Sequence, residues 1–225
     1  MDRIYDDFDD GTPRIMNNPL KITETNEKRI IDFYLINVIE DVNNYIDFLR
    51  AVDSCRPQDE IIVHINCYGG ELDVGMNIYD SLIGSDANVT ISVEGVCASC
   101  ASIIMLAGNQ WNVTPHSYVM IHEWSGCEHG KWHEIKAQFK YDETIVENQF
   151  RKIYKNFLTD EEIEQCLNGK DFYFDSEETV KRLNNYQKED LEREEMMQKI
   201  GQKYSAMAQK EVDDYLKKSK KKKIK

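Results

Sequence analysis

Short apolar runs and amphipathic helical patterns alternate along the first half of the chain. Apolar runs cover residues 30–38, 61–65 and 89–93, and each leads into a segment with hydrophobic residues at three- and four-residue spacing. A fourth run, at residues 118–121, ends in a histidine. Buried strands that alternate with helices in this way are typical of parallel βαβ units. The pattern predicts an α/β fold.

The second half of the chain carries more charge, and its strands are shorter. Residues 131–157 form a long, charged helical pattern. Thr159 and Glu162 have the spacing of a capping box, which predicts the start of another helix. A brief strand at residues 172–174 and a helix at residues 176–183 complete the predicted domain.

The two ends of the chain depart from this pattern. Residues 1–28 are polar and lack clear periodicity, which predicts a flexible N-terminal arm. Residues 184–225 place hydrophobic residues at helical spacing among Glu and Lys, which predicts a charged helical extension. Residues 217–225 hold seven lysines and no acid. We expect a solvated basic tail, with docking to an acidic partner as the alternative.

Composition and charge argue against several classes of protein. The net charge of −13 disfavours nucleic-acid binding as the main role. No stretch approaches the eighteen consecutive apolar residues of a membrane span, and the acidic N-terminus does not resemble a secretory signal. The six cysteines are scattered through predicted core elements, so we expect reduced thiols in a cytoplasmic protein.

The segment from Gly95 to Ser102 carries the strongest chemical signal. It joins the apolar run 89–93 to a helical pattern of small residues, so Ser99 is expected where a strand becomes a helix. A serine at such a turn is exposed at the edge of the sheet, near the free N–H groups of the helix start. Ser99 is therefore a candidate nucleophile for attack on a carbonyl carbon.

A serine nucleophile needs a base and two donors for the oxyanion. Of the five histidines, His122 is best placed, because it follows a strand pattern at the edge where open α/β sheets bind ligands. The backbone N–H of Cys100, directly after the serine, is a natural first donor. The pair Gly69-Gly70 is a candidate for the second, since glycine lets the main chain pass close to a substrate.

Several segments, in order along the chain, carry a resemblance to a known family. They are Asn66-Cys67-Tyr68-Gly69-Gly70, Gly75-Met76-Asn77-Ile78-Tyr79-Asp80, Gly95 to Cys100, Val119-Met120-Ile121-His122, and Asp171 to Phe174 followed by Ser176 to Val180. These segments resemble ClpP, the proteolytic subunit of the ATP-dependent Clp protease. The resemblance spans about residues 29–183. The sequence is identified as a divergent member of that family with a C-terminal extension.

The resemblance implies a serine-type endopeptidase with a Ser-His-Asp triad. Ser99 would be the nucleophile, His122 the general base and acid, and Asp171 the orienting carboxylate. The backbone N–H groups of Gly70 and Cys100 would form the oxyanion hole. Neither a metal nor another cofactor is implied.

The family's fold is a repeated ββα, crotonase-like core with a protruding handle of a helix plus a strand. The protease domain would cover residues 29–183 and the handle about residues 125–157, between an axial arm at 1–28 and the extension at 184–225. The family implies a homo-oligomer of two heptameric rings around a chamber, fed by an AAA+ unfoldase. Its substrates are unfolded proteins, which pair with the enzyme as an added strand. Neither nucleic acid nor a membrane is implied as a partner.

Departures from the family pattern keep other functions open. Tyr68 replaces a proline, Cys100 replaces a methionine, and the acidic N-terminal arm and the charged C-terminal extension are atypical of the family. These departures leave the triad intact but the identity of the unfoldase partner open. One alternative is a ClpP-related processing protease, such as a viral head-maturation enzyme, that acts without an unfoldase. Another is a non-catalytic ring component. A crotonase-type acyl-CoA enzyme would share the fold without needing the triad. Asp175 is the nearest rival to Asp171.

Two other motifs suggest different chemistry. Cys97 and Cys100 form a C-x-x-C pair at a predicted helix start, where thiol pKa values fall, so a redox pair is an alternative. Cys127, His129 and His133 have metal-like spacing, but no fourth ligand is evident in the sequence. We expect no metal site there.

Overall fold

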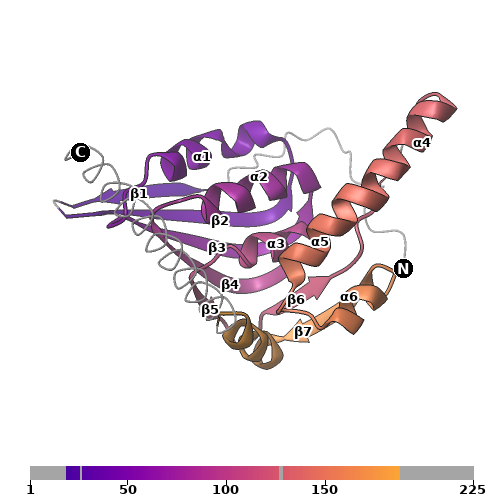
Figure 1. Ribbon diagram of the computed structural model, residues 1–225. Coiled ribbons are helices and arrows are strands. Elements are labelled where there is room, and N and C mark those ends of the chain that lie inside the picture. The colour runs from indigo at the N-terminus through magenta and orange to yellow at the C-terminus, as the bar shows by residue number, and fades with distance from the viewer. Residues whose placement is uncertain (1–18, 26, 127–128, 188–225) are drawn as a thin grey trace, which may run out of the picture.

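One seven-stranded sheet organises the chain over the residues that the computed structural model describes, 19–25, 27–126 and 129–187. In spatial order its strands are β1 (Leu20–Glu24), β2 (Arg29–Ile39), β3 (Glu60–Gly70), β4 (Asn88–Ala98), β6 (Tyr118–Ile121) and β7 (Phe172–Asp175), with β5 (Gln110–Val113) paired to β4 beside this path. Figure 1 shows helices packed along the sheet and one helix that projects away from it.

The central strands β2, β3 and β4 run parallel, which confirms the prediction from the alternating pattern. Burial alternates along each strand. In β2, Ile31, Phe33 and Leu35 are fully buried, whereas Asp32 is half-buried and Tyr34 is exposed. Successive side chains of a strand point to opposite faces, so one face of this sheet is covered.

Helices α1 (Ile46–Asp53), α2 (Leu72–Ile83) and α3 (Cys100–Met105) pack along the sheet (Figure 1). A short 3-10 helix, η1 (Val42–Tyr45), precedes α1, and the Asp41 carboxylate accepts a hydrogen bond from the Asn43 N–H as its cap. Every residue of α3 is buried. The helix that follows Ser99 therefore lies inside the core, and its start cannot move freely.

Two strands were not predicted from the hydrophobic pattern. β1 lies within the segment expected to be a polar arm, and four of its five residues are exposed. β5 alternates between exposed and half-buried residues. β1 pairs with β2, and β5 with β4, through backbone hydrogen bonds. A strand held mainly by such bonds leaves no apolar signal in the sequence.

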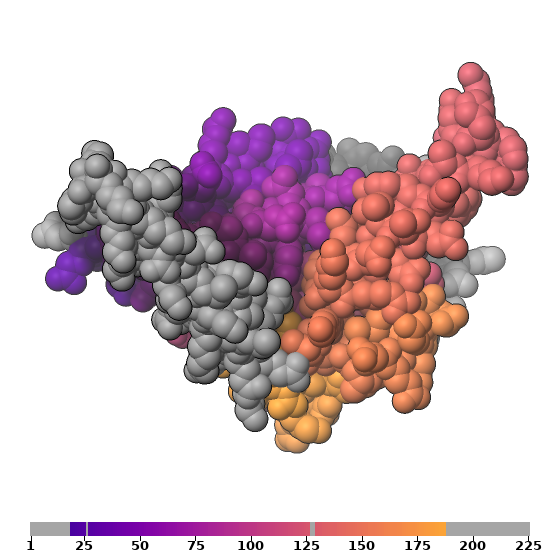
Figure 2. Space-filling model, in the orientation of Figure 1, coloured from indigo at the N-terminus to yellow at the C-terminus, as the bar shows by residue number. Residues whose placement is uncertain are grey.

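A helix projects from the body within residues 125–157, where the handle was expected, and is called the handle below (Figures 1 and 2). It consists of α4 (Trp132–Tyr141), a π-helical turn η2 (Asp142–Val146) and α5 (Glu147–Tyr154). α4 has no buried residue, whereas α5 is anchored by buried apolar side chains. Residues 122–126 and 129–131 form no strand, although the handle was expected to contain one. An extended segment becomes a strand only where another segment pairs with it.

The chain after the handle packs on the core through Leu158, Ile163 and Cys166. α6 (Asp160–Cys166) begins with the predicted capping box, in which Thr159 Oγ1 accepts from the Glu162 N–H at 3.1 Å and the Glu162 carboxylate accepts from the Thr159 N–H at 2.9 Å. Residues 176–187 are helical, and Arg182 among them donates to both carboxylate oxygens of Glu162 at 2.8 Å. This bidentate pair ties the last described helix to α6.

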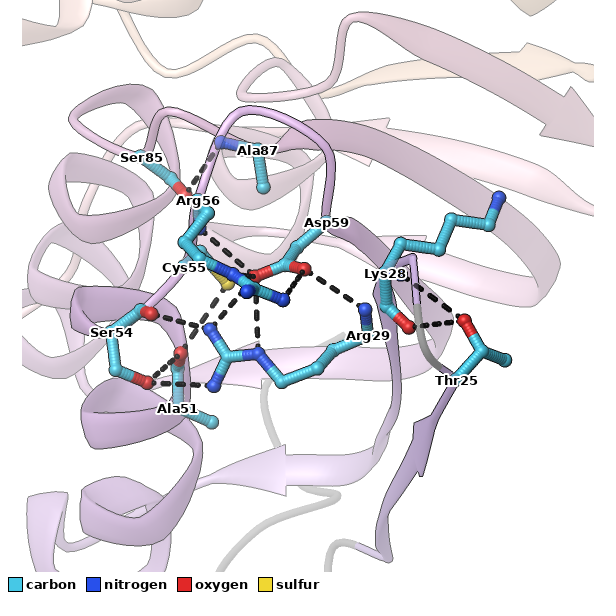
Figure 3. Close-up of polar contacts among 10 residues, drawn as sticks. All are labelled: Thr25, Lys28, Arg29, Ala51, Ser54, Cys55, Arg56, Asp59, Ser85 and Ala87. Atoms are coloured by element: carbon cyan, nitrogen blue, oxygen red, sulfur yellow. Dashed lines mark hydrogen bonds and ion pairs between the residues drawn. The ribbon is translucent and has the colours of Figure 1, made fainter.

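A buried charged cluster lies at the start of β2 and β3 (Figure 3). Asp59 has no exposed surface, and its carboxylate accepts hydrogen bonds from the backbone and guanidinium groups of Arg29 and Arg56 at 2.8–3.3 Å. The bonds from Arg56, and then those from Arg29, hold the pKa of Asp59 well below its usual value against the burial that raises it. The cluster fixes the loop before β3 against β2.

Most of the predicted arm and extension lies outside the described residues. Of residues 1–28, the structure describes 19–25, 27 and 28, and of residues 184–225 it describes 184–187, which are helical. The proposed domain boundaries stay predictions. Among the described helices, none is both long enough and apolar enough to cross a membrane.

Candidate active site

Ser99 occupies the junction between β4 and α3, as the sequence predicted. The strand ends at Ala98 and the helix begins at Cys100. Ser99 has φ 54° and ψ −132°, a backbone conformation that residues other than glycine rarely adopt. Its N–H donates to the Met120 carbonyl oxygen at 2.9 Å, which holds the turn against β6. A strained turn between strand and helix presents a serine hydroxyl outward.

His122 directly follows β6, and β6 lies beside the end of β4. Ala98 pairs with Met120, so the ends of the two strands meet. The Nε2 atom of His122 lies 2.8 Å from Ser99 Oγ, and both residues are partly exposed. At this distance the imidazole can take the hydroxyl proton. The structure thus brings together two residues that are 23 positions apart in the sequence.

The main chain of Gly69 and Gly70 passes beside Ser99. Their φ angles are +93° and +141°, values that L side chains disfavour. A Cβ atom on Gly69 would lie 2.5 Å from Ser99 Cβ, and one on Gly70 would lie 2.0 Å from the carbonyl oxygen of Ile39. Neither position has room for a side chain: the serine turn requires glycine at position 69, and the backbone of Ile39 in β2 requires glycine at position 70.

The backbone N–H groups of Gly70 and Cys100, the predicted oxyanion donors, both act on the Cys100 thiol. Burial raises the pKa of the Cys100 thiol to about 12, and the hydrogen bonds of these two backbone N–H groups oppose that rise. The thiol is packed at the same place, with Sγ 3.4 Å from the Gly70 carbonyl oxygen. Their role as the two donors that stabilise an oxyanion beside Ser99 stays a prediction.

A cleft of about 360 Å³ contains Ser99 and His122. One wall comes from the end of β3 and from α2, and the other from the handle. The larger apolar side chains that line it are Leu72, Met76, Ile103, Trp124, Phe150 and Ile153. This volume and this mixture of apolar walls with a few polar groups are typical of a ligand-binding site.

Comparison with known proteins agrees with this geometry. A family model described as Clp protease matches residues 20–182, which is more than half of the chain. The chain belongs to the Clp protease family.

Relatives of this Clp protease family member include several ATP-dependent Clp protease proteolytic subunits. The subunit of Deinococcus radiodurans is 31% identical over 147 residues, which cover 62% of this chain and 69% of the relative. That of Bacteroides fragilis is 30% identical over 131 residues (57% and 56%), and subunit 1 of Gloeobacter violaceus is 34% identical over 103 residues (45% and 52%). The chain thus spans between about half and about two thirds of the length of these relatives.

In this Clp protease family member, the expected orienting acid is Asp171. β6 and β7 are antiparallel, and Ile121 pairs with Phe172. One further step in the same register sets His122 opposite Asp171, and side chains at opposed positions lie within reach of each other. Among the described residues, no hydrogen bond joins the two side chains, and Asp171 is exposed. Its orienting role stays a prediction.

The rival carboxylate, Asp175, has another partner. Its Oδ1 accepts a hydrogen bond from the Glu178 N–H at 2.9 Å, which caps the helical residues 176–187. In the β6–β7 ladder it lies opposite Tyr118, at the far end of the strand from His122. The register therefore favours Asp171 over Asp175.

The thiols near Ser99 do not have the properties of a redox pair. Burial raises the pKa of Cys67 to about 11 and that of Cys100 to about 12, and it raises the pKa of the fully buried Cys97 as well. A helix start was expected to lower the pKa values of Cys97 and Cys100, but desolvation outweighs it. Protonated, inaccessible thiols are poor nucleophiles. The C-x-x-C pair is therefore part of the packed core.

The metal alternative falls partly outside the described residues, because Cys127 lies there. His129 and His133 are exposed. Within the described ranges, no three His, Cys, Asp or Glu side chains are grouped as metal ligands. Another histidine, His64, is half-buried, with Nδ1 2.6 Å from the Glu94 carboxylate.

The sequence did not predict the wall that the handle contributes to the cleft. Phe150, Ile153 and Tyr154 of α5 are buried and line it. Their spacing places them on one helix face in an otherwise charged segment, and this was the available signal. Ser102 was not predicted to have a role either, yet its side chain contacts Tyr154.

Proposed function

We propose that this chain is the proteolytic subunit of an ATP-dependent Clp protease, a serine endopeptidase that hydrolyses peptide bonds of unfolded proteins. The observation that carries the proposal is the 2.8 Å contact between His122 Nε2 and Ser99 Oγ at a left-handed serine turn. Family membership and the names of the relatives support the same activity.

In the proposed acylation step, Ser99 Oγ attacks the carbonyl carbon of the scissile peptide bond while His122 Nε2 takes its proton. The carbonyl oxygen gains the negative charge and is stabilised by the N–H groups of Gly70 and Cys100. The imidazolium then gives its proton to the leaving amine as the carbon–nitrogen bond breaks. The first peptide product leaves, and an acyl ester remains on Ser99.

Deacylation reverses these roles. A water molecule attacks the ester carbonyl, and His122 takes the water proton. The same two N–H groups stabilise the second oxyanion. The proton then passes from His122 to Ser99 Oγ as the ester bond breaks, which restores the free hydroxyl and releases a carboxylate product.

We propose that Asp171 orients His122 during these steps. In the antiparallel register it lies opposite His122, one step beyond the last paired residues of the ladder. A carboxylate at that place stabilises the imidazolium and selects the tautomer whose Nε2 accepts the serine proton. If the pairing of β6 and β7 extended by one residue, His122 would pair with Asp171 and the two side chains could form a hydrogen bond.

We further propose that the protein works in the cytoplasm as a homo-oligomer of two heptameric rings, supplied with substrate by an AAA+ unfoldase. The handle supports a subunit contact, because it exposes the large hydrophobic side chains Trp132, Phe139, Tyr141 and Ile145. A grouping of such side chains on a projecting element is typical of an interaction surface. The buried, protonated thiols suit a reducing compartment.

Degradation assays with and without an unfoldase test this function. Assembled wild-type protein should hydrolyse short peptides alone and degrade a folded protein only with an AAA+ unfoldase and ATP. Ser99→Ala should do neither while keeping the same mass in light scattering. Peptide hydrolysis that no unfoldase extends to folded proteins would favour the processing-protease alternative, and an inactive assembled wild type would contradict the enzyme proposal.

A further inference from the structure

Two buried hydroxyl groups link the handle to the nucleophile turn. Tyr154 of α5 is 2% exposed and Ser102 of α3 is 0% exposed. The phenolic oxygen of Tyr154 lies 2.6 Å from Ser102 Oγ, and Ser102 Oγ lies 2.6 Å from the carbonyl oxygen of Ser99. Residues 52 positions apart thus form a continuous chain of hydrogen bonds that ends on the nucleophile.

The direction of each proton in this chain is determined. The Ser99 carbonyl can only accept, so the single hydroxyl proton of Ser102 is committed to it. Ser102 Oγ must then accept from Tyr154, whose hydroxyl is the donor. Burial raises the pKa of Tyr154, so that proton stays in place. The Ser102 backbone N–H donates to the same Ser99 carbonyl at 2.9 Å.

The Ser99 carbonyl belongs to the peptide unit that also contains the Cys100 N–H. A peptide unit is planar and trans, so its C=O and N–H point in opposite directions and turn together. Fixing the carbonyl with the Ser102 hydroxyl and N–H therefore fixes the direction of the Cys100 N–H. This N–H is one of the two proposed oxyanion donors, and its direction decides whether it can stabilise the intermediate.

We propose that Tyr154 and Ser102 are positioning residues, which set the plane of the Ser99–Cys100 peptide and make the oxyanion hole depend on the seating of the handle helix α5. The inference rests on the proposed protease function. Neither side chain touches the reacting atoms. A shift of α5 removes the Tyr154 donor from Ser102. The Ser102 hydroxyl is then held less firmly against the Ser99 carbonyl, and so is the peptide that carries the Cys100 N–H.

The backbone strain at Ser99 makes such support necessary. Its φ of 54° is a costly conformation for serine, and strained residues persist only where their surroundings hold them. The Ser99 N–H is held by the Met120 carbonyl, and the Ser99 carbonyl is held by Ser102. Loss of the Ser102 hydroxyl leaves the carbonyl held by the Ser102 N–H alone, so the peptide plane can tilt while the serine hydroxyl stays near His122.

Kinetics of three variants test this proposal: Ser102→Ala, Tyr154→Phe and the double variant. With a fluorogenic peptide, we expect Ser102→Ala to lower kcat by roughly 10- to 100-fold and Tyr154→Phe by about tenfold, with KM changed less than twofold. The double variant should be no worse than Ser102→Ala, because both substitutions break the same chain. Ser102→Thr keeps the hydroxyl and should recover part of kcat.

Two control variants separate positioning from general core damage. Ser117 is also buried and donates its hydroxyl three residues back, to the Thr114 carbonyl at 2.7 Å, but does not line the cleft. Tyr45 is a buried tyrosine away from the cleft. Ser117→Ala should lower the melting temperature as Ser102→Ala does, and both Ser117→Ala and Tyr45→Phe should leave kcat within about twofold of wild type.

The outcomes distinguish this inference from the proposed function. An active wild type with Ser102→Ala and Tyr154→Phe at wild-type kcat would overturn the inference and leave the protease function standing. A rise in KM with kcat unchanged would also overturn it. So would a double variant whose fold-decrease in kcat equals the product of the two single decreases. A wild type without peptidase activity overturns both. If Ser102→Ala fails to assemble, the kcat of Tyr154→Phe alone tests the inference, because that variant keeps the aromatic side chain and loses only the hydroxyl.

Discussion

The two ends of the central strands differ in how their polar side chains are bonded. At the start of β3, Asp59 is fully buried and bonded by two arginines, so its charge is satisfied on all sides (Figure 3). At the end of β4, Ser99 is strained, partly exposed and bonded through its side chain to His122 alone among the described residues. One end of the sheet thus carries a charge whose hydrogen bonds are saturated, and the other, open end carries a hydroxyl that is accessible to a ligand.

This difference separates stability from chemistry within one sheet. A saturated buried charge has no capacity left for a ligand, and its loss exposes the fold to unfolding. An exposed serine hydroxyl contributes little to stability and stays available for reaction, and the predicted N–H donors beside it would stabilise the charge that develops. Parallel strands place all their carboxyl ends at one edge, so the reactive end of this sheet is the one that carries Ser99.

The largest expected effect is that of His122→Ala at the open end. Peptidase activity should fall at least about 10³-fold, because His122 is the partner of the serine hydroxyl among the described residues. The melting temperature and the mass in solution should stay close to those of wild type. Steady-state assays and light scattering measure both, and loss of assembly would mean that His122 has a structural role.

Gly69→Ala should damage the same end by crowding it. Its new Cβ would lie 2.5 Å from Ser99 Cβ, and displacement of a nucleophile by about 1 Å costs on the order of 10²-fold in rate. Gly169→Ala is the matched control for stability, because Gly169 has φ +87° and no atom within 4 Å of a new Cβ. Gly69→Ala should melt below this control, and full activity in Gly69→Ala would contradict the close approach.

Asp59→Asn, at the opposite end of the strands from Ser99, should cause a large loss of stability and little change in activity, the reverse of His122→Ala. The pKa of Asp59 is lowered from its ordinary 3.8 in the folded state, so its stabilisation is present above about pH 4 and is lost as pH falls further. The melting temperature of Asp59→Asn should lie well below that of wild type at pH 7. The difference should shrink below pH 4.

Thermal melts across pH, with kcat measured on the folded protein, check this prediction. Asp53→Asn is the control, because Asp53 lies near Asp59 in the sequence and is exposed. A gap between wild type and Asp59→Asn that is equal at pH 3 and pH 7 would show that the charge of Asp59 is not what stabilises the cluster.

The smallest effect is expected from thiol alkylation at the open end. The raised pKa values of Cys67 and Cys100, about 11 and about 12, leave almost no thiolate at pH 8. Iodoacetamide should leave peptidase activity within about twofold, with Cys67, Cys97 and Cys100 unmodified in peptide mapping. Rapid alkylation of Cys100 with loss of activity would revive the redox alternative.

Local signals made much of this site predictable. The apolar runs gave β2, β3 and β4, and the small-residue turn after the third run gave Ser99 its place. His122 was predictable because it follows a strand, and the ends of neighbouring parallel strands meet. The glycine pair was predictable because only glycine tolerates such a close approach of the main chain.

Features that depend on long-range contacts were not predictable. β1 is a polar edge strand without an apolar pattern, and the bond between Tyr154 and Ser102 joins the handle to the core across 52 residues. The buried thiol pKa values also depend on packing, which outweighs the effect of the helix start. Whether Asp171 contacts His122 depends on how far the pairing of β6 and β7 extends, and sequence spacing does not contain that information.

Active-site labelling of the assembled protein tests the central claim most directly. A fluorophosphonate probe should modify wild-type protein at a single serine, and peptide mapping should place the label on Ser99. Ser99→Ala should take up no label while keeping its mass and melting temperature. An assembled wild type that stays unlabelled, or a label on any other serine, would contradict the assignment of the strained turn after β4 as the nucleophile.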